Sequence, residues 1–281
     1  MSGTVTLLAT GVLTTLQDEG RRGYAALGVG RSGACDRSAH RLANRLVGNH
    51  EDAATLEVTF GGLVLRADRD LLVVTTGARC QGDWPHNAPA RLLAGRELRL
   101  GAPVSGLRTY VAVRGGFAAE RVLGSCSTDV MSGLGPAPLE PGATLPVSGA
   151  DQPCPGVDLA PVADPVAGDL TVRITAGPRR DWFGDEAWAL LTGQPYVVSN
   201  DSNRVGLRLE GDPLERLRTD ELPSEGLVRG ALQIPPSGRP VLFLADHPAT
   251  GGYPVIGYVD DGDVDACGQL RPGQRVHLRG R

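Results

Sequence analysis

Lysine is absent from this 281-residue chain, and all 28 of its basic residues are arginine. Because a guanidinium group stays charged in proteins, it cannot serve as an attachable or deprotonatable amine. The chain therefore cannot carry its own biotin, form Schiff bases or perform Ser-Lys amidase chemistry alone. It also lacks a Gly-x-x-x-x-Gly-Lys-Ser/Thr loop, so any ATP chemistry needs another kind of site or a partner.

Long apolar runs and strong net charge are missing as well. No segment approaches the roughly 18 apolar residues of a membrane span. The N-terminus does not show the charged region and apolar core of a secretory signal. The net charge is −4, and no basic run exceeds a few arginines, which disfavours nucleic acid and anionic membranes as partners. These absences predict a cytoplasmic protein.

Paired cysteines are the third absence. The five cysteines are odd in number and widely scattered, without a Cys-x-x-Cys pair. This spacing argues against a disulfide framework and against a structural zinc site. We expect reduced, mostly buried thiols and no metal site built from cysteine.

The segments that are present are short and β-like, and they are separated by many of the 39 glycines and 21 prolines. Alternating apolar and polar residues are typical of half-buried strands. Short strands with frequent turns favour a mainly β fold of barrels or sandwiches over alternating βαβ units. The expected strands are residues 56–60, 71–76, 97–100, 110–113, 170–174, 206–209, 231–234, 241–244, 255–259 and 275–278.

Few helices are expected. Apolar residues recur at helical spacing over residues 36–47, where Asp36 can cap the N-terminus and Gly48 can end the helix. A second helix is predicted over residues 181–191, ended by Gly193.

The length of 281 residues exceeds the roughly 100–200 residues of a typical domain and predicts two domains, residues 1–150 and 165–281. Residues 149–168 are rich in Pro, Ala, Asp and Gly and show no periodicity, which is typical of a linker. Residues 139–147 and 270–278 are similar to each other, each with a Pro-Gly turn before an alternating strand. Their positions, before the linker and at the C-terminus, are those expected of duplicated β-domains.

The densest group of reactive side chains follows the expected strand 241–244. Asp246, His247, Thr250 and Tyr253 supply acceptors, donors and one group that titrates near neutrality. Gly251 and Gly252 let a backbone approach a ligand closely. The alternative is a polar β-turn with a satisfied histidine, since turns favour these residues.

Two glycine-rich loops in the first half lead into the expected helix, where backbone N–H groups favour an anion. They contain Asp18 and Arg21, and then Ser32, Gly33 and Asp36. The alternative is tight turns with an Asp cap. Residues 124–129 contain three hydroxyl groups and one carboxylate, and we interpret these side chains as N-caps of another possible helix.

The second half carries an uncommon combination of amide, guanidinium and carboxylate at Asn203, Arg204 and Glu225. Arg204 can clamp a carboxylate or phosphate in a bidentate manner. An ion pair between Arg204 and Glu225 is the alternative.

Together these motifs resemble the biotin-dependent carboxyltransferase-like family over essentially the whole chain. One departure is Pro248-Ala249, where the family often has Gln-Thr before Thr-Gly-Gly. The similar segments are residues 15–24, 32–36, 42–49, 124–129, 177–182, 202–209, 224–226, 245–246 and 250–254.

The resemblance implies two cyclophilin-like β-barrel domains with a few short helices, a cleft between them and a smaller companion subunit. The family includes the C subunit of 5-oxoprolinase, proteins termed allophanate hydrolase subunit 2, an antagonist of a sporulation kinase inhibitor, and the carboxyltransferase part of urea carboxylase. The missing lysine excludes a whole urea carboxylase and a Ser-Ser-Lys amidase.

The leading hypothesis is therefore that the chain is the C subunit of an ATP-dependent 5-oxoprolinase. Its cofactor would be ATP together with Mg, and no biotin would be attached to this chain. Its partners would be the B subunit of 5-oxoprolinase, of the allophanate hydrolase subunit 1 type, and a lactam-hydrolase-type A subunit. Arg21 and Arg204 would stabilise charge, Asp246 or Glu225 would position a nucleophile or metal, and His247 would shuttle a proton. The alternatives are a carboxyltransferase acting on a biotin carried by another chain and a non-enzymatic regulator that binds a kinase inhibitor.

Overall fold

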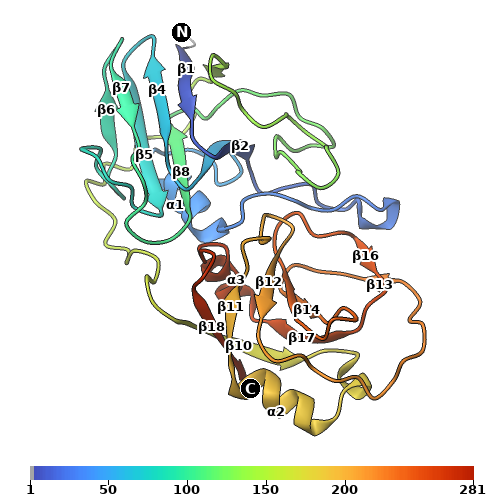
Figure 1. Ribbon diagram of the computed structural model, residues 1–281. Helices are drawn as coiled ribbons and strands as arrows, with labels where there is room; N and C mark the ends of the chain where they lie inside the picture. Colours follow the sequence, from blue (N-terminus) through green and yellow to red (C-terminus); the bar gives the residue numbers. More distant parts are fainter. Residues whose placement is uncertain (1–2) are drawn as a thin grey trace. The chain divides into compact units, whose positions relative to one another are not determined.

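The structure of the protein, a computed structural model, describes residues 3–281 (Figure 1). Met1 and Ser2 lie outside the described residues. They are the first residues of the predicted first domain and of the N-terminal segment that was searched for a signal sequence. β-Strands dominate the described chain, and its three α-helices are short. The predicted mainly β fold with a few short helices is confirmed.

The chain divides into two compact units. The first unit extends to residue 21 and includes residues 32–129 and 133–165, and the second includes residues 22–31, 130–132 and 166–281. The predicted boundaries at residues 150 and 165 treat each domain as one continuous stretch. Two short segments from the first half of the sequence instead belong to the second unit, which local composition does not reveal.

The first unit contains two sheets with antiparallel pairing. The four-stranded sheet has the order β7-β4-β1-β9, and the five-stranded sheet has the order β2-β3-β8-β5-β6. Buried Val, Leu and Ala side chains from both sheets form its main core. The strands are β1 (Gly3–Thr10), β2 (Leu13–Gln17), β3 (Thr55–Thr59), β4 (Leu63–Ala67), β5 (Leu71–Gly77), β6 (Ala90–Leu92), β7 (Glu97–Arg99), β8 (Arg108–Val113) and β9 (Thr144–Val147).

The resemblance implies a barrel for this unit, whereas its strands form two sheets. Glycine residues lie where the chain passes from one sheet to the other. The chain passes from one sheet to the other between β1 and β2, at Gly11, and between β3 and β4, at Gly61. Both glycines have positive φ, and a Cβ on Gly11 would overlap the main-chain oxygen of Gly61. Only glycine allows this backbone approach, so the strands bend here and exchange partners.

Helix α1 (Arg37–Leu46) packs its small apolar face on the five-stranded sheet. Ala39 and Ala43 belong to a buried cluster with Tyr110 and Ala112 of β8. The Asp36 carboxylate accepts a 2.9 Å hydrogen bond from the Ala39 amide, and the chain leaves the helix through a left-handed Gly48. The predicted helix and its Asp36 cap are confirmed.

His40 gives this helix a pH dependence. Burial lowers the pKa of His40, although nearby acidic groups oppose this effect. Below about pH 6.5 the unfolded chain therefore binds a proton at His40 that the folded chain does not, and acid favours unfolding. Denaturant titrations at pH 7.5 and 5.5 should show stability falling more for the wild type than for His40→Gln, by at most about 1.4 kcal/mol per pH unit. Parallel pH profiles for the two proteins would contradict this assignment.

The second unit contains a closed barrel with the order β10-β17-β14-β15-β12-β11-β18 (Figure 1). β10 and β18 pair in parallel, and the other neighbouring strands are antiparallel. β13 and β16 form a separate two-stranded sheet. The strands are β10 (Leu170–Ala176), β11 (Pro195–Val198), β12 (Gly206–Glu210), β13 (Glu225–Gly226), β14 (Ala231–Gln233), β15 (Val241–Phe243), β16 (Thr250–Gly251), β17 (Val255–Val259) and β18 (Arg275–Gly280).

The predicted second helix starts later than expected. The short 3-10 turns are η1 (Ala25–Leu27) and η2 (Arg180–Trp182), and the helices of this unit are α2 (Asp185–Gly193) and α3 (Asp261–Cys267). α2 begins four residues after Asp181, because η2 and an extended Phe183 interrupt the helical spacing. The sequence pattern missed α3 altogether.

All ten expected strands are present, and β9 is the strand expected after the Pro-Gly turn of residues 139–147, but seven further strands were not expected. The unexpected strands are β1, β2, β4, β6, β11, β13 and β16. Several contain only two to four residues, too few for alternation to be visible, and they form because a neighbouring strand pairs with them. The two similar Pro-Gly segments both turn through a left-handed glycine, Gly142 or Gly273, before β9 or β18.

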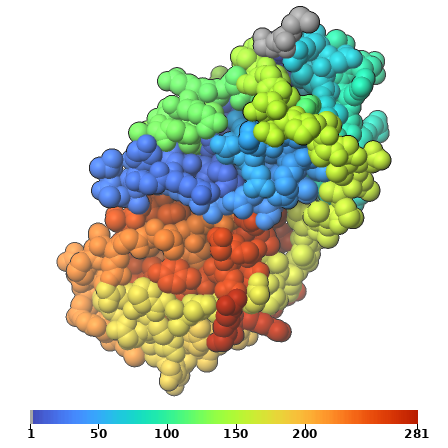
Figure 2. Space-filling view, turned by 180° about the vertical axis from the view of Figure 1, so that it is seen from behind, coloured from blue at the N-terminus to red at the C-terminus, as the bar shows by residue number. Residues whose placement is uncertain are grey.

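The predicted linker, residues 149–168, contains neither helix nor strand. Figure 2 shows its yellow-green part lying on the surface of the first unit. The Arg114 guanidinium donates to the Gln152 main-chain oxygen at 2.5 Å, and the Ala160 amide donates to the Asn87 main-chain oxygen at 2.8 Å. The segment is thus tied to the first unit as far as residue 165.

Three of the five cysteines are buried, and all five are free thiols, as expected. Among residues 3–281, none of the helices combines the length and apolar character that a membrane crossing requires.

Candidate functional site

Arg204 and Asp246 form a buried bidentate ion pair at one end of the β12–β15 ladder. Arg204 Nε donates to Asp246 Oδ2 at 2.9 Å, and Nη2 donates to Oδ1 at 3.1 Å. Both side chains are at most 2% exposed. The ladder makes the pair adjacent, because the Asp246 amide also donates to the Arg204 main-chain oxygen at 3.0 Å. The amide of Val130, from a segment that belongs to the second unit, adds a 3.0 Å hydrogen bond to Asp246 Oδ2.

The alternative pairing of Arg204 with Glu225 is wrong. Glu225 lies on β13 and pairs with Arg179, whose Nε donates to Glu225 Oε2 at 3.1 Å. Hydrogen bonding from Arg179 lowers the pKa of the Glu225 carboxyl. The physical reason is topological: β12 pairs with β15, whereas β13 pairs with β16, so Asp246 rather than Glu225 lies opposite Arg204.

A pocket of about 480 Å³ lies on the second unit, above strands β12, β14 and β15. It brings together Asn203 and Tyr253, two of the predicted binding residues, from segments 50 residues apart in the sequence. Its apolar lining includes Phe243, Val205, Val241 and Pro235, and its polar lining includes Asp201, Asn203, Arg208 and Gln233. A mainly apolar hollow with a few convergent polar groups is the usual form of a small-molecule site.

Arg208 is the cation of this pocket, and it was not among the predicted site residues. Its side chain is exposed and makes no ion pair or side-chain hydrogen bond with the described part of the chain. The sequence contained the signal, because Arg208 is the second arginine of the Ser202-Asn-Arg-x-Gly-x-Arg-Leu209 segment. Alternation along β12 turns Leu207 and Leu209 into the barrel and leaves Arg208 on its outer face.

Tyr253, which follows the predicted residues Thr250 to Gly252 in one loop, forms one wall of the pocket. Thr250 and Gly251 form strand β16, which pairs with Glu225 and Gly226 of β13. Gln233 Nε2 donates to the Tyr253 main-chain oxygen at 3.1 Å and holds the wall against β14. Gly252 is exposed next to Tyr253. A role of Thr250, Gly251 and Gly252 in binding stays a prediction.

Gly251 packs so closely on Gln233 that a side chain there should disturb the wall. A Cβ at this position would lie 2.7 Å from Gln233 Nε2 and 2.8 Å from Leu227 Cδ1. We expect Gly251→Ala to displace Gln233, to lower kcat/KM of the active complex by about tenfold, and to cost only about 1 kcal/mol of stability. Gly226→Ala on the paired strand is the control, since its Cβ would meet nothing within 4 Å. Equal kinetics for the two variants would contradict a role of this wall.

His247 lies beside the pocket. Its Nδ1 is 2.8 Å from the Pro248 main-chain oxygen, and its ring centroid is 6.3 Å from that of Phe243, a pocket residue. An Nδ1–H donated to a carbonyl fixes the tautomer, so that Nε2 is the nitrogen able to accept a proton. The proposed proton shuttle stays a prediction.

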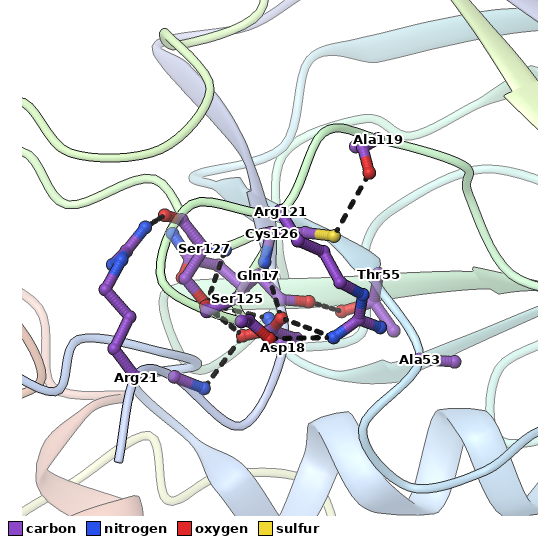
Figure 3. A network of polar contacts seen from close by, with 12 residues as sticks. Gln17, Asp18, Arg21, Ala53, Thr55, Ala119, Arg121, Ser125, Cys126 and Ser127 are labelled. Carbon is purple, nitrogen blue, oxygen red and sulfur yellow. Dashed lines mark hydrogen bonds and ion pairs between the residues drawn. The ribbon is translucent and has the colours of Figure 1, made fainter. Parts of the chain in front are cut away.

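In the first unit, Asp18 is the centre of a buried hydrogen-bond network (Figure 3). Its Oδ1 accepts from the Gly20 amide at 2.8 Å and from the hydroxyls of Ser125 and Ser127 at 2.6 Å each. Its Oδ2 accepts from the Cys126 amide at 2.7 Å. The carboxylate thus ties residues 125–127 to the end of β2.

The capping interpretation of residues 124–129 is therefore wrong. In the described chain no helix begins at these residues, and the two serine hydroxyls bind a carboxylate more than 100 residues earlier in the sequence. Local spacing contains no information about such a distant acceptor.

The other predicted residues of the first half lie around this network. Ser32 is buried with a left-handed backbone, and its hydroxyl is 3.4 Å from the Thr128 main-chain oxygen. A Cβ on Gly33 would lie 3.0 Å from the main-chain oxygen of Asp18 and 3.0 Å from the main-chain nitrogen of Gly20. The two loops therefore pack closely. Asp36 is occupied as the helix cap, and its carboxylate already lies at the helix N-terminus where an anion was expected.

The described residues contain no pre-formed metal site built from several acidic, histidine or cysteine side chains. Among residues 3–281, no three His, Cys, Asp or Glu side chains gather closely enough to hold a metal. Asp246 and Glu225, the predicted metal-positioning acids, are each engaged by an arginine. A role of either carboxylate beyond these pairs stays a prediction.

Known proteins similar to this chain match almost all of its length. The family described as the carboxyltransferase domain, subdomains A and B, matches residues 27–280. The C subunit of 5-oxoprolinase from Escherichia coli strain K12 is 35% identical over 280 residues, which cover 97% of this chain and 89% of that protein. The urea amidolyase of Lachancea kluyveri is 30% identical over 95% of this chain but only 16% of its own length.

The fold is shared with solved structures as well. The crystal structure of TTHA0988 superimposes with a TM-score of 0.88 at 34% identity, covering 98% of this chain. This chain spans about half of that protein, 55% of its length. Sequence and fold agree, and the chain belongs to the family of carboxyltransferase domains with subdomains A and B.

Proposed function

We propose that this protein is the C subunit of an ATP-dependent 5-oxoprolinase, which opens 5-oxo-L-proline to L-glutamate together with companion subunits. The observation that carries the proposal is the extent of the similarity to the C subunit of the Escherichia coli 5-oxoprolinase, which covers 89% of that protein. The similarity to urea amidolyase instead covers a 16% portion of a much longer chain.

The pocket of the second unit suits a small anionic amide. Arg208 supplies a cation for a carboxylate, and the side-chain amides of Asn203 and Gln233 can pair with the N–H and the carbonyl oxygen of a lactam. Phe243 and Tyr253 form flat apolar walls for a five-membered ring. The Arg204–Asp246 pair positions the ends of β12 and β15 beneath this pocket, and His247 is the group that moves a proton at its edge.

ATP and magnesium would be held largely by a companion subunit. The sequence has no Gly-x-x-x-x-Gly-Lys-Ser/Thr phosphate-binding loop, and the described residues contain no cluster of metal ligands. The expected companions are the B subunit of 5-oxoprolinase, of the allophanate hydrolase subunit 1 type, and the lactam-hydrolase-type A subunit. In this proposal the chain alone is inactive and acts in the cytoplasm. Residues 1–150 and 165–281 form the bulk of its two domains, and residues 22–31 and 130–132 join the second.

The second candidate is a carboxyltransferase subunit that acts on a biotin-carried carboxylate with urea or a similar amide as acceptor. It is favoured by the 30% identity to urea amidolyase over 95% of this chain. Both candidates need a site for a small amide, so the pocket alone does not separate them.

The test is a substrate comparison with the chain co-purified with its genomic neighbours. We expect ADP and glutamate to form in the presence of ATP and 5-oxo-L-proline. Urea with ATP, bicarbonate and a biotinylated carrier should give no turnover. Turnover with urea and none with 5-oxo-L-proline would establish the carboxyltransferase instead.

A further inference from the structure

The guanidinium of Arg21 is buried in the first unit with most of its hydrogen-bonding capacity unused. Arg21 is 1% exposed, and its Nη2 donates to the main-chain oxygen of Ser127 (Figure 3). Its Nε and Nη1 are buried and have no hydrogen-bond partner among residues 3–281. A buried charge is strongly unfavourable unless it is paired. The described chain thus holds a cation without the anion that would compensate it.

Asp18, the carboxylate of the same network, is not that anion. Its two oxygens already accept four hydrogen bonds, from the Gly20 and Cys126 amides and from the hydroxyls of Ser125 and Ser127. Figure 3 shows the Arg21 guanidinium beside Ser127 and turned away from the Asp18 carboxylate. The free nitrogens therefore require an acceptor from outside this network.

A second unused donor lies next to Ser127. The hydroxyl of Thr128 is buried and has no hydrogen-bond partner within residues 3–281. The Thr128 main chain is fixed on both sides, because its amide donates to the Leu16 oxygen at 2.9 Å and its oxygen accepts from Gln17 Nε2 at 3.0 Å. Arg21 donates to Ser127 and Thr128 is the next residue, so both unused donors lie at the same hydrogen-bonded segment.

We propose that Arg21 and Thr128 form a binding site for an oxyanion, a carboxylate or a phosphoryl group. A guanidinium presents paired donors to an oxyanion along its Nε–Nη2 edge and along its Nη1–Nη2 edge. Arg21 Nη2 gives one of its two hydrogens to Ser127, so its other hydrogen and the neighbouring free nitrogen can still donate to two oxygens of such a group, and the Thr128 hydroxyl can donate to one of them. The identity of the natural anion rests on the proposed function. Because the pocket at Arg208 takes the carboxylate of 5-oxo-L-proline there, a phosphoryl group of ATP is the first candidate for this site, and the carboxylate is the alternative that the test distinguishes.

Access to this site requires local movement, because the free nitrogens have no solvent-exposed surface. Gly135 packs directly on Arg21 Nη2, and a Cβ there would overlap it. Gly133 and Gly135 both have positive φ in this covering loop. Displacement of the loop admits the anion, whose charge then compensates the guanidinium.

The experiment measures thermal unfolding of the full chain, without companions, in the presence of three probes. Inorganic phosphate tests the phosphoryl group, 5-oxo-L-proline tests the carboxylate, and 2-pyrrolidone is the matched lactam without a carboxylate. We expect a saturable rise in Tm with phosphate or 5-oxo-L-proline, according to the source of the anion, and none with 2-pyrrolidone. No rise with either anion would overturn the proposal.

Variants assign the effect to Arg21. Arg21→Met should leave the Tm of the free chain unchanged or raised, because it removes an unpaired buried charge, and should weaken anion binding at least tenfold. Arg21→Lys should also weaken binding, since an ammonium lacks the fork, and Thr128→Val should weaken it less. The control is Arg96→Met at an exposed arginine, which should bind the anion as the wild type does.

Two results would assign Arg21 a purely structural role: a chain that loses several degrees of Tm or fails to fold without Arg21, or an anion shift that persists in both Arg21 variants. The assay contains no turnover step, so it is separable from the proposed function. Suppose that the free chain shows an anion-dependent rise in Tm that requires Arg21, but that the assembled complex has no 5-oxoprolinase activity. That pair of results would refute the proposed function and would leave the anion site in place.

Discussion

Replacing Asp246 by alanine is expected to lower the free energy of unfolding by about 3–5 kcal/mol. The change leaves the Arg204 guanidinium, which is 2% exposed, without its carboxylate, and it leaves the Val130 amide without its acceptor. Such a loss is a large fraction of the roughly 5–15 kcal/mol that stabilises a typical domain. Urea titration followed by circular dichroism measures it directly.

Two controls distinguish this buried pair from an ordinary ion pair. Asp220→Ala removes the partner of Arg218 in an exposed pair and should cost at most about 1 kcal/mol. The double variant Arg204→Met with Asp246→Leu removes both charges and should recover most of the stability lost in Asp246→Ala. A single Asp246→Ala variant as stable as the wild type would show that the pair is not structural.

Replacing Arg208 by methionine is expected to lower kcat/KM for 5-oxo-L-proline by about 100-fold in the assembled complex, or about 2.7 kcal/mol of transition-state stabilisation. The reason is that Arg208 is the cation of the pocket and that methionine keeps its apolar stem but not its charge. Stability should change by less than about 0.5 kcal/mol, because the side chain is exposed.

The matched control is Arg239→Met, another exposed arginine of the second unit that lies outside the pocket lining. It should keep wild-type kinetics. If the two variants behave alike, the carboxylate of the substrate is bound elsewhere, and Arg21 becomes the next residue to test.

Helices and strands could be predicted where the local sequence shows a clear pattern of apolar and polar residues. The helix at residues 36–47 has both an apolar stripe and an Asp cap, so its spacing and its first residue could be recognised. The ten expected strands have enough alternation to be seen. β13 and β16, with two residues each, exist only because they pair with each other, which no local pattern reveals.

The candidate site was predictable in its residues but not in its pairings. The sequence indicated Arg204, Asp246 and Glu225, but only the strand order shows that Asp246 lies opposite Arg204. Asp18 and Ser125 likewise meet across 107 residues. Arg208 lies in the recognised segment of residues 202–209, but its role in a pocket depends on the distant residue Tyr253, which only the structure places beside it.

The most direct test of this account is a titration of companion subunits into the purified chain, with ADP and glutamate measured in the presence of ATP and 5-oxo-L-proline. The account predicts no turnover by the chain alone and lactam-dependent turnover that rises until the companions reach a fixed ratio to it. Robust turnover by the chain alone, or none in the assembled complex, would contradict it.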